Sequence, residues 1–406
     1  MDRRSLLKLL AATTVVGCSP RTVTGKKLRV VVAGAGIVGA SIAYHLAKAG
    51  VAVTVIDKQG PATHASGGTF AWINATWAKT PRSYHSLSKE SVANWGELHQ
   101  ELDLPVRWGG SLEWFDNEPR QEKLAAQIAQ QFEWGERARM VDAAELAELE
   151  PNLDFGGATR AAYSENDGTV DSILATQKLL LAAEGHGAII QYPCELTDVS
   201  LQGGKLVAVE TNLGSIKADK LVLATGAQPD AGLRFAASDI PQRSTPGIIV
   251  TSKPMPRCIN RIISAPGIHI HQRDDGRLVI GEQEGAPKNE AHALRLAARP
   301  NHYPDPIIAE QHAVRMFAVA RRFAPCTADA VVESVRIGWR PLPIDGHPVL
   351  GASEARPDVY LAIMHSGVTL APIVGQLAAH ELTEGVEVER LQDFRPGRDF
   401  EAIKRY

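Results

Sequence analysis

The stretch from residue 28 to residue 39 constrains this chain most, because it joins a buried strand to a glycine-rich turn. Its β-branched residues suit a buried parallel strand. Gly34, Gly36 and Gly39 then follow with the spacing G-x-G-x-x-G. In this motif the glycines permit a tight turn, close approach of the backbone to a pyrophosphate, and close packing of a helix on the strand. Residues 37–49 are predicted to form that helix, with its N-terminus facing the phosphates.

A second apolar run, residues 51–56, is predicted to form the next strand, and it ends at Asp57. This acid lies about 20 residues beyond the glycines, where a carboxylate can accept hydrogen bonds from a ribose diol. The backbone of Ile37 and Val38 at the helix N-terminus, and Lys58 after the acid, complete the contacts expected of this unit. Strand, glycines, helix, strand and acid together predict an adenine dinucleotide site, and they leave open whether the dinucleotide is NAD or FAD.

Length and composition exclude several classes of protein. With 406 residues the chain can bury a large core, and it is expected to form two domains or more. Its formal net charge of -3 gives no electrostatic reason to expect nucleic-acid binding. The four cysteines show no C-x-x-C pair, so we predict neither a zinc site nor a dense disulfide framework.

The N-terminus has the organisation of an export signal. Paired arginines, Arg3 and Arg4, precede a short apolar run, residues 9–16, and a Gly-Cys pair that ends at Cys18. These parts describe a signal peptide, and the apolar run is far shorter than the about 20 residues that span a bilayer. The arginines resemble a twin-arginine signal, and residues 15–18 resemble a bacterial lipobox that would make Cys18 the lipidated first residue. We therefore expect an exported protein, periplasmic or membrane-anchored as a lipoprotein, with an uncleaved cytoplasmic N-terminus as the alternative.

The remainder of the chain alternates between helical and strand patterns. Helices are expected over residues 83–102, 120–138, 142–150, 172–184, 292–296, 307–323 and 371–382. Strands are expected over residues 188–191, 205–211, 215–217, 220–224, 247–252, 267–271, 277–281 and 359–364, with a strand and loop over 161–171. Residues 104–115 are expected to form a hairpin or a pair of strands.

Three further motifs follow the first one. They are Ala224-Thr225-Gly226, then Gly338-Trp339-Arg340-Pro341 with residues 344–348, and then His-Ser-Gly-Val-Thr-Leu-Ala-Pro over residues 365–372. With the first motif, this set resembles the FAD-dependent D-amino-acid oxidase (DAO) family, which includes glycine oxidases and sarcosine oxidases or dehydrogenases. The resemblance covers residues 28–382. Its C-terminal motifs separate this family from NAD enzymes that share the first motif, so the cofactor that it implies is FAD.

The resemblance and the alternation of elements imply an α/β fold. A GxGxxG Rossmann-type FAD-binding domain is expected beside a substrate domain with a mainly antiparallel sheet (α+β), each built from discontinuous segments. Residues 1–26 are assigned to the signal peptide and linker, residues 27–84, 157–232 and 333–406 to the FAD-binding domain, and residues 85–156 and 233–332 to the substrate domain.

Within these motifs the resemblance implies roles for individual residues. Arg340 is the first catalytic candidate, because a guanidinium can grip the carboxylate of an amino acid through two hydrogen bonds; a structural salt bridge is the alternative. His365, the second, is expected close to the flavin ring, where it either takes part in the chemistry or satisfies a backbone group. Backbone amides at a strand-to-helix turn are expected to point at flavin carbonyl oxygens. The cofactor contacts implied beyond the first motif are Gly67, Gly68, Leu196, Ala224, Gly226, Gly367, Val368 and Thr369.

Three other histidines have two interpretations each. His64 lies in the loop after the second strand, where some dehydrogenases of the superfamily attach FAD covalently, and a solvent-facing loop histidine is the alternative. His269 and His271 alternate on one expected strand and should share a face, but two ligands do not make a metal site, so packing or pocket lining is expected.

Only Ser366 separates His365 from the glycine that follows, where the best-known glycine oxidases carry a longer loop with an arginine. Glycine is therefore a doubtful substrate.

The resemblance implies oxidation of the C–N bond of a small amine, most often an amino acid or an N-methyl amino acid. Hydride would pass to flavin N5, and water would hydrolyse the resulting imine. The partners expected are a small-molecule amine and an electron acceptor, oxygen or a quinone, with no nucleic acid. Two alternatives stay open: an exported lipoprotein that FAD merely stabilises, and an NAD-dependent dehydrogenase.

Overall fold

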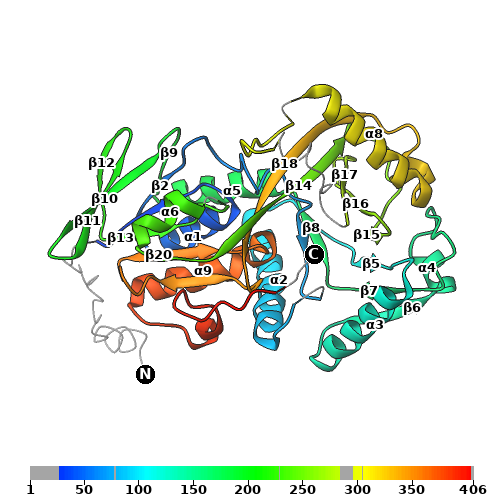
Figure 1. The fold of residues 1–406 in the computed structure, drawn as a ribbon, viewed down its shortest axis with the longest axis horizontal. Helices are drawn as coiled ribbons and strands as arrows, with labels where there is room; N and C mark the ends of the chain where they lie inside the picture. Colours follow the sequence, from blue (N-terminus) through cyan, green and yellow to red (C-terminus); the bar gives the residue numbers. More distant parts are fainter. Residues whose placement is uncertain (1–26, 77–78, 228, 284–295, 304, 404–406) are drawn as a thin grey trace, which may run out of the picture.

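The computed structural model describes residues 27–76, 79–227, 229–283, 296–303 and 305–403. Two large sheets lie side by side, each covered by its own helices, and the long strands β14 and β18 run between the two halves (Figure 1). The expected signal segment, with Cys18, and most of the helix expected over residues 292–296 lie outside the described residues. No helix among the described residues is long and apolar enough to cross a membrane.

The first large sheet has six strands, and every neighbouring pair is parallel except β19 with β20. In spatial order they are β19 (Val349–Ala352), β20 (Val359–Ile363), β13 (Lys220–Leu223), β1 (Arg29–Ala33), β2 (Ala52–Ile56) and β9 (Ile189–Gln191). This is the doubly covered parallel sheet that the dinucleotide motif predicts.

Alternate side chains of β1 are buried on opposite faces of the sheet, because successive side chains of a strand point to opposite faces. Val30 and Val32 lie in a core formed with the helices α1 (Ile37–Lys48), α2 (Arg82–Leu102), α5 (Ser172–Gly185) and α9 (Gly367–Glu384). Val31 and Ala33 lie in a second core on the other face. That face is covered by α6 (Pro229–Ala236) and by a three-stranded sheet of β10 (Leu196–Gln202), β11 (Lys205–Thr211) and β12 (Gly214–Lys217).

The second large sheet has eight strands and is antiparallel apart from the pair of β15 with β5. In spatial order they are β18 (Val332–Pro343), β14 (Gln242–Ser252), β17 (Leu278–Gly281), β16 (Ile268–Gln272), β15 (Ile262–Ala265), β5 (Ser111–Glu113), β7 (Arg160–Ser164) and β6 (Ala138–Asp142). The turn at residues 274–276 joins β16 to β17 as a hairpin. The mainly antiparallel sheet predicted for the second domain is thus confirmed.

Helix α8 (Pro306–Phe323) covers one face of this sheet through its apolar residues, such as Met316 and Phe317. Asp305 caps it by accepting hydrogen bonds from the first backbone amides. A disulfide between Cys258 and Cys326 lies below α8, and Cys194 is a free, buried cysteine. The remaining elements are α3 (Glu118–Glu133), α4 (Ala143–Leu149), the short helices η1 (Pro325–Thr327) and η2 (Glu389–Phe394), and a small sheet of β3 (Trp72–Ile73), β8 (Gly168–Val170) and β4 (Val106–Trp108).

The structure differs from the sequence predictions of local structure in several places. Residues 104–115 do form two strands, as predicted, but no hairpin, because β4 and β5 pair in different sheets on either side of Gly110, whose φ of 80° turns the chain. The helix expected to reach residue 138 ends at Glu133, before Gly135, and Ala138 begins β6 instead. Strand β10 was missed altogether, and α9 begins at Gly367 rather than near residue 371.

The two large sheets also divide the chain differently from the expected segments. Strand β7 and all of β18 from residue 333 onward fall within segments assigned to FAD binding, yet both strands pair in the eight-stranded sheet. Helix α2 falls mostly in a segment assigned to the substrate domain, yet it packs in the core with α9 and the six-stranded sheet. Strand pairing and helix packing, rather than position along the chain, determine to which of the two sheets each of these elements belongs.

Candidate active site

A cavity of about 610 Å³ opens where β1, β2 and β13 end. The carboxyl ends of parallel strands are where open α/β sheets bind ligands, and the volume is in the range of cofactor pockets. The residues that line the cavity come from segments far apart in the sequence. Its lining includes these residues expected to bind the cofactor: Gly34, Gly36, Ile37, Val38, Asp57, Lys58, Leu196, Ala224 and Gly226.

Gly34 and Gly39 are glycines because the backbone leaves no room for a side chain. Gly34 has a φ of 112°, and a Cβ there would lie 2.3 Å from the carbonyl oxygen of Ala224. A Cβ on Gly39 would lie 2.0 Å from the carbonyl oxygen of Gly34. The tight turn and the close packing of helix on strand are therefore as predicted.

Asp57 is held rigidly at the rim of the cavity. Its Oδ2 accepts a hydrogen bond from the amide of Ala35 at 2.9 Å, and its Oδ1 accepts from the amides of Gln59 and Gly60 at 2.9 and 2.8 Å. The carboxylate therefore ties β2 to the glycine turn as well as facing the cavity. A carboxylate fixed in this way is preorganised for a ribose diol.

The loop from Gly60 to Gly68 wraps over the glycine turn. The Ser66 hydroxyl accepts a hydrogen bond from the amide of Ile37 at 3.0 Å, which occupies one donor at the N-terminus of α1. His64 lines the cavity, and burial lowers its pKa, so its imidazole is neutral at physiological pH. Ser66 was not singled out from the sequence, since its partner lies 29 residues away. Covalent attachment of FAD to His64 stays a prediction.

Gly67 and Gly68 lie outside this lining, and the structure gives each a packing role. A Cβ on Gly67 would lie 2.3 Å from the carbonyl oxygen of Ala62. A Cβ on Gly68 would lie 2.5 Å from the amide nitrogen of Gly338 on β18. The second contact lets the loop cross directly over the strand that carries Arg340.

Arg340 projects from the face of the eight-stranded sheet that Gly68 crosses. Its Nη1 donates to the carbonyl oxygen of Pro246 at 3.2 Å. A Cβ on Gly247 would lie 2.8 Å from Nη2 and 3.0 Å from Cζ, so the guanidinium lies directly over this glycine. The absence of a side chain at Gly247 thus defines where the charge of Arg340 sits.

His269 and His271 do share a face, as expected, and they form a wall with Phe70 and Trp72. The ring of Phe70 lies 5.4 Å from that of His269 and 4.8 Å from that of His271, while Trp72 lies 5.8 Å from His269. Burial lowers the pKa of both histidines to about 3, and the nearby charge of Arg340 adds to the effect at His269. The wall beside Arg340 is therefore electrically neutral across the physiological pH range. The described residues contain no cluster of three or more metal-ligating side chains.

The first turn of α9, which His365 precedes, belongs to the half of the molecule with the six-stranded sheet. A Cβ on Gly367 would lie 3.1 Å from Val38 Cγ2, so the first turn of α9 lies against the first turn of α1. The Thr369 hydroxyl donates to the carbonyl of Trp72 at 3.2 Å, which ties α9 to the aromatic wall. The structure places these residues outside the lining of the large cavity: Gly39, Gly67, Gly68, Arg340, His365, Gly367, Val368 and Thr369.

Two buried donors hold the turn that precedes α9. The Lys79 ammonium and the Tyr84 hydroxyl both donate to the hydroxyl of Ser366, at 2.9 and 2.7 Å. Lys79 is only 4% exposed, so a positive charge is buried beside the helix N-terminus. Neither residue carries a sequence signal, because only the fold brings residues 79 and 366 together.

Comparison with known proteins identifies the family. The profile described as "FAD dependent oxidoreductase" (DAO) matches residues 29–381, which is most of the chain. The chain belongs to the FAD-dependent oxidoreductase family. FAD is therefore its cofactor, and the resemblance predicted from the four motifs is confirmed.

Relatives match the oxidoreductase over nearly its whole length. It is 28% identical over 388 residues to the uncharacterized oxidoreductase YurR of Bacillus subtilis (strain 168), covering 88% of this chain and 96% of the relative. It is 25% identical over 386 residues to a subunit of opine oxidase from Agrobacterium tumefaciens (strain Ach5), covering 90% and 96%. Among solved structures, glycine oxidase from Bacillus cereus ATCC 14579 superimposes with a TM-score of 0.79 at 25% identity, covering 92% of this chain and 99% of that one.

The cavity of the oxidoreductase fits FAD. Gly226 leaves open backbone at its wall, and the N-terminus of α1 faces it. Asp57 stands where a ribose diol would bind, and Leu196 lies on the same wall beside Cys194. Backbone amides, one fixed carboxylate and a helix N-terminus are the groups that adenosine diphosphates require.

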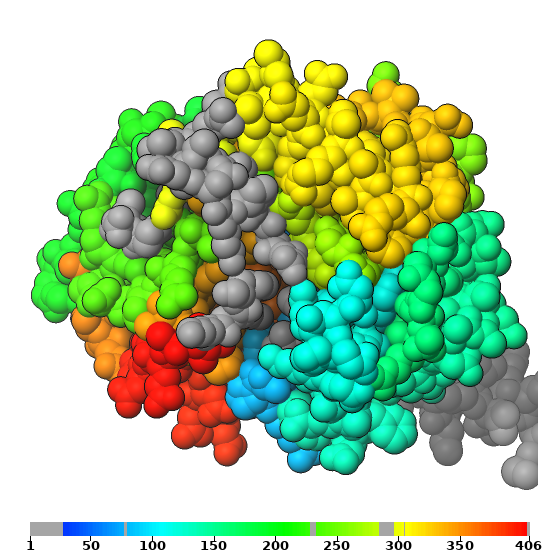
Figure 2. Space-filling view, turned by 45° about the vertical axis from the view of Figure 1, so that its right-hand side comes forward, coloured from blue at the N-terminus to red at the C-terminus, as the bar shows by residue number. Residues whose placement is uncertain are grey.

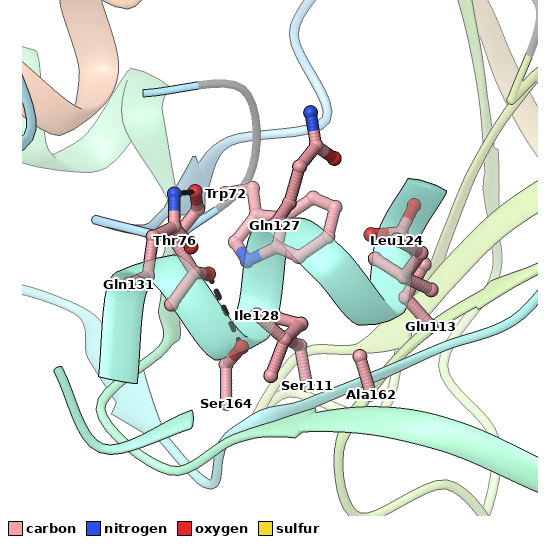
Figure 3. A pocket seen from close by; sticks show the side chains of 10 residues that line it. All are labelled: Trp72, Thr76, Ser111, Glu113, Leu124, Gln127, Ile128, Gln131, Ala162 and Ser164. Carbon is pink, nitrogen blue, oxygen red and sulfur yellow. Dashed lines mark hydrogen bonds between the residues drawn. The ribbon is translucent and has the colours of Figure 1, made fainter. Parts of the chain in front are cut away.

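A small second cavity, about 10 Å³, lies under Trp72 (Figure 3). One face of α3, through Leu124, Ile128 and Gln131, closes it from one side. Its volume is at the lower limit for a single water molecule. Its walls combine polar and apolar side chains and include Glu113, which is 5% exposed.

Two buried carboxyl groups lie at this small cavity: Glu113 lines it, and Asp167 lies behind the lining residues Trp72 and Ser111. Burial raises the pKa of Glu113 to about 7, although its Oε1 accepts a hydrogen bond from Ser264 at 2.9 Å. Burial likewise raises the pKa of Asp167 to about 8. Asp167 Oδ2 accepts from the indole N–H of Trp72 at 2.8 Å and from the Ser111 hydroxyl at 2.7 Å. Both carboxyls thus tend to keep their protons, and Asp167 orients the indole of the aromatic wall.

We expect Asp167→Asn to be more stable than the wild type at pH 8 to 9, with an advantage that shrinks as the pH falls to 5. The carboxyl of Asp167 keeps its proton up to a pKa of about 8, whereas in the unfolded chain it loses the proton near 3.8. Wild-type stability therefore falls as the pH rises between these values, by on the order of a few kcal/mol. Asparagine mimics the protonated acid and accepts the same hydrogen bonds from Trp72 and Ser111.

Urea unfolding at pH 5, 7 and 9 measures this difference. The exposed Asp154, whose carboxylate accepts one backbone N–H, provides the control as Asp154→Asn, which should follow the wild-type pH dependence. Identical pH dependence in Asp167→Asn and the wild type would show that the carboxyl titrates normally.

Proposed function

We propose that the oxidoreductase oxidises the C–N bond of a small amine that carries a carboxylate, an amino acid or N-methyl amino acid. The observation that carries this proposal is the guanidinium of Arg340, which lies over Gly247 on the sheet face and next to a neutral wall. A guanidinium held in place beside neutral aromatic groups can bind a carboxylate through strong, charge-assisted hydrogen bonds. The names of two relatives, a subunit of an opine oxidase and a glycine oxidase, support an amine that bears a carboxylate.

In this proposal each part of the site has a separate task. Arg340 binds the carboxylate and so orients the carbon next to the nitrogen. FAD, when bound, would supply the hydride acceptor for that carbon, and water would hydrolyse the resulting imine. Phe70 and Trp72, with the two neutral histidines, form an apolar surface that excludes water from this carbon. The first turn of α9 presents backbone amides and a helix dipole, which favour negative charge nearby.

An anaerobic screen tests the proposal directly. The holoprotein is mixed with D- and L-amino acids, N-methyl amino acids, and matched amines without a carboxylate, and the bleaching of the flavin absorbance is followed. We expect bleaching with at least one carboxylate-bearing amine and little with its decarboxylated counterpart. If no amine bleaches the flavin, the alternative of a protein that FAD merely stabilises is preferred.

We also propose, from the N-terminal sequence alone, that the oxidoreductase is exported and held to the membrane by a lipid on Cys18. An exported oxidoreductase of this kind would pass its electrons to oxygen or to a membrane quinone. Export in the folded state suits a protein that binds FAD before it leaves the cytoplasm.

A further inference from the structure

Residues 296–303 form a strap, here named the 296–303 strap, which runs from the eight-stranded sheet to the rim of the FAD cavity. Leu296 is buried in a small core with Ile248 and Ile337. The indole N–H of Trp339 donates to the carbonyl of Pro300 at 2.9 Å, and the amide of Ile337 donates to the carbonyl of Asn301 at 3.0 Å. These contacts fix the strap along β18.

The strap also binds two loops that line the FAD cavity. Arg299 Nη1 donates to the carbonyl oxygen of Ala227 at 3.0 Å. Asn301 Nδ2 donates to the carbonyl oxygen of Thr63 at 3.1 Å. Ala227 and Thr63 both belong to the lining of the cavity, and so do Ala298 and Arg299 of the strap. The strap thus connects the two rims of the cavity. In the space-filling view, yellow atoms from this part of the chain border the green part that carries β9 to β13 (Figure 2).

Arg299 is presented to the cavity by a turn that holds its backbone. Its amide donates to the carbonyl of Leu296 at 2.9 Å, and its φ is 50°, a conformation that residues other than glycine seldom adopt. Its guanidinium lies 5.6 Å from the centre of the Trp339 ring, which also lines the cavity. One Nη group is committed to Ala227, so the remaining N–H groups of the guanidinium can serve a ligand.

The lining carries two cations that a diphosphate could bind, Lys58 and Arg299. Its carboxylates are Asp57, which is engaged by backbone amides, and Glu195. One of the amides at the N-terminus of α1 already donates to Ser66, which leaves part of the phosphate charge for side chains to neutralise. Arginine forms strong, charge-assisted hydrogen bonds with phosphate oxygens.

We propose that Arg299 binds the diphosphate of FAD and that the 296–303 strap is a second wall of the cofactor site, contributed by the substrate-sheet half of the molecule. Binding of FAD by Arg299 does not depend on which amine is oxidised. Because Arg299 belongs to the 296–303 strap, the affinity for FAD would depend on a segment outside the Rossmann-type unit.

Equilibrium binding to the apoprotein tests the proposal. FAD, ADP and adenosine are titrated into wild type, Arg299→Ala and Arg299→Gln at low and high salt, with tryptophan fluorescence or calorimetry as the readout. We expect both variants to bind FAD and ADP about tenfold to hundredfold more weakly at low salt, the usual loss for one charged hydrogen bond. Adenosine, which lacks phosphate, should bind all three proteins equally, and the loss for ADP should shrink at high salt.

Arg299→Gln separates binding of phosphate from docking of the strap, because glutamine keeps an N–H donor for Ala227 but carries no charge. The matched control is Arg321→Ala. Arg321 is likewise an exposed arginine that donates to a backbone carbonyl, that of Ala328 at 3.0 Å, and it lies outside the cavity lining. It should leave all three affinities unchanged.

Three results would overturn the proposal. The first is an affinity for FAD and ADP within about twofold of the wild type in Arg299→Ala, a difference below that of one charged hydrogen bond. The second is an equal loss for ADP and adenosine, and the third is a wild-type affinity for ADP in Arg299→Gln. Either of the last two would mean that Arg299 only attaches the strap to Ala227.

Discussion

Arg340→Ala is expected to raise the KM for an amine that carries a carboxylate by about 30-fold to several thousand-fold, with the flavin still bound. Removing one partner of a desolvated, hydrogen-bonded charge pair costs about 2–5 kcal/mol, and each 1.4 kcal/mol is a factor of about ten. Arg340 lies outside the lining of the FAD cavity, so the affinity for FAD should change little. Steady-state kinetics, together with the flavin content of the purified variant, measure both effects.

Arg340→Lys and Gly247→Ala refine this prediction. Lysine keeps the charge but loses the planar pair of donors, so KM should still rise steeply. Alanine at Gly247 keeps Arg340 but would place a Cβ 2.8 Å from its Nη2, so the guanidinium must move and KM should rise more than kcat falls. An unchanged KM in Arg340→Lys, accompanied by lower stability, would mean that Arg340 only forms a structural contact.

Gly39→Val is expected to abolish most flavin binding. A Cβ at this position would lie 2.0 Å from the carbonyl oxygen of Gly34, and neither backbone segment is free to move, since Gly34 itself lies against Ala224. Forcing atoms into a packed site costs typically about 1–3 kcal/mol, and here the strain falls on the turn that lines the cavity. The ratio of flavin to protein absorbance and a urea unfolding curve measure the loss, which we expect to be about tenfold or more in affinity.

The matched control is Gly96→Ala, in α2. No atom lies within 4 Å of a Cβ built on Gly96. Alanine there should keep full flavin content and add about 0.5–1 kcal/mol of stability, as in other helix interiors. Full flavin content in Gly39→Val would show that α1 can move away from β1 without loss of the site.

The cofactor half of the fold could be predicted from sequence because its signals are local. Strand β1, the glycine turn, α1, β2 and Asp57 lie within about 30 residues, the span of one βαβ unit, and each position has a steric or hydrogen-bonding reason. Gly39 must be small because it touches Gly34, which lies in the same turn. Helix α8 is similar, since Asp305 caps the helix that it precedes. In each case the residue that sets the structure lies close in sequence to the residue that it affects.

The short strands could not be predicted in the same way. Strand β5 has three residues and pairs in parallel with β15, about 150 positions further along the chain. Strand β6, also short, pairs with β7 across an intervening helix. A strand of this length has too few alternating positions to reveal which face is buried. The partners, and with them the sheet to which each strand belongs, are determined by packing of the whole chain.

The sequence by itself therefore determined the cofactor and the family. The residues that recognise FAD cluster in short motifs, whose glycines and acid act on neighbouring backbone. Only the tertiary structure decided what surrounds Arg340 and which distant segments share the FAD cavity. Gly247 lies below that guanidinium because β14 pairs with β18, and His269 stays neutral because Phe70 and Trp72 cover it. Arg299 reaches the cavity because its strap is fixed to β18. Contacts of this kind depend on register and burial, which no local pattern carries.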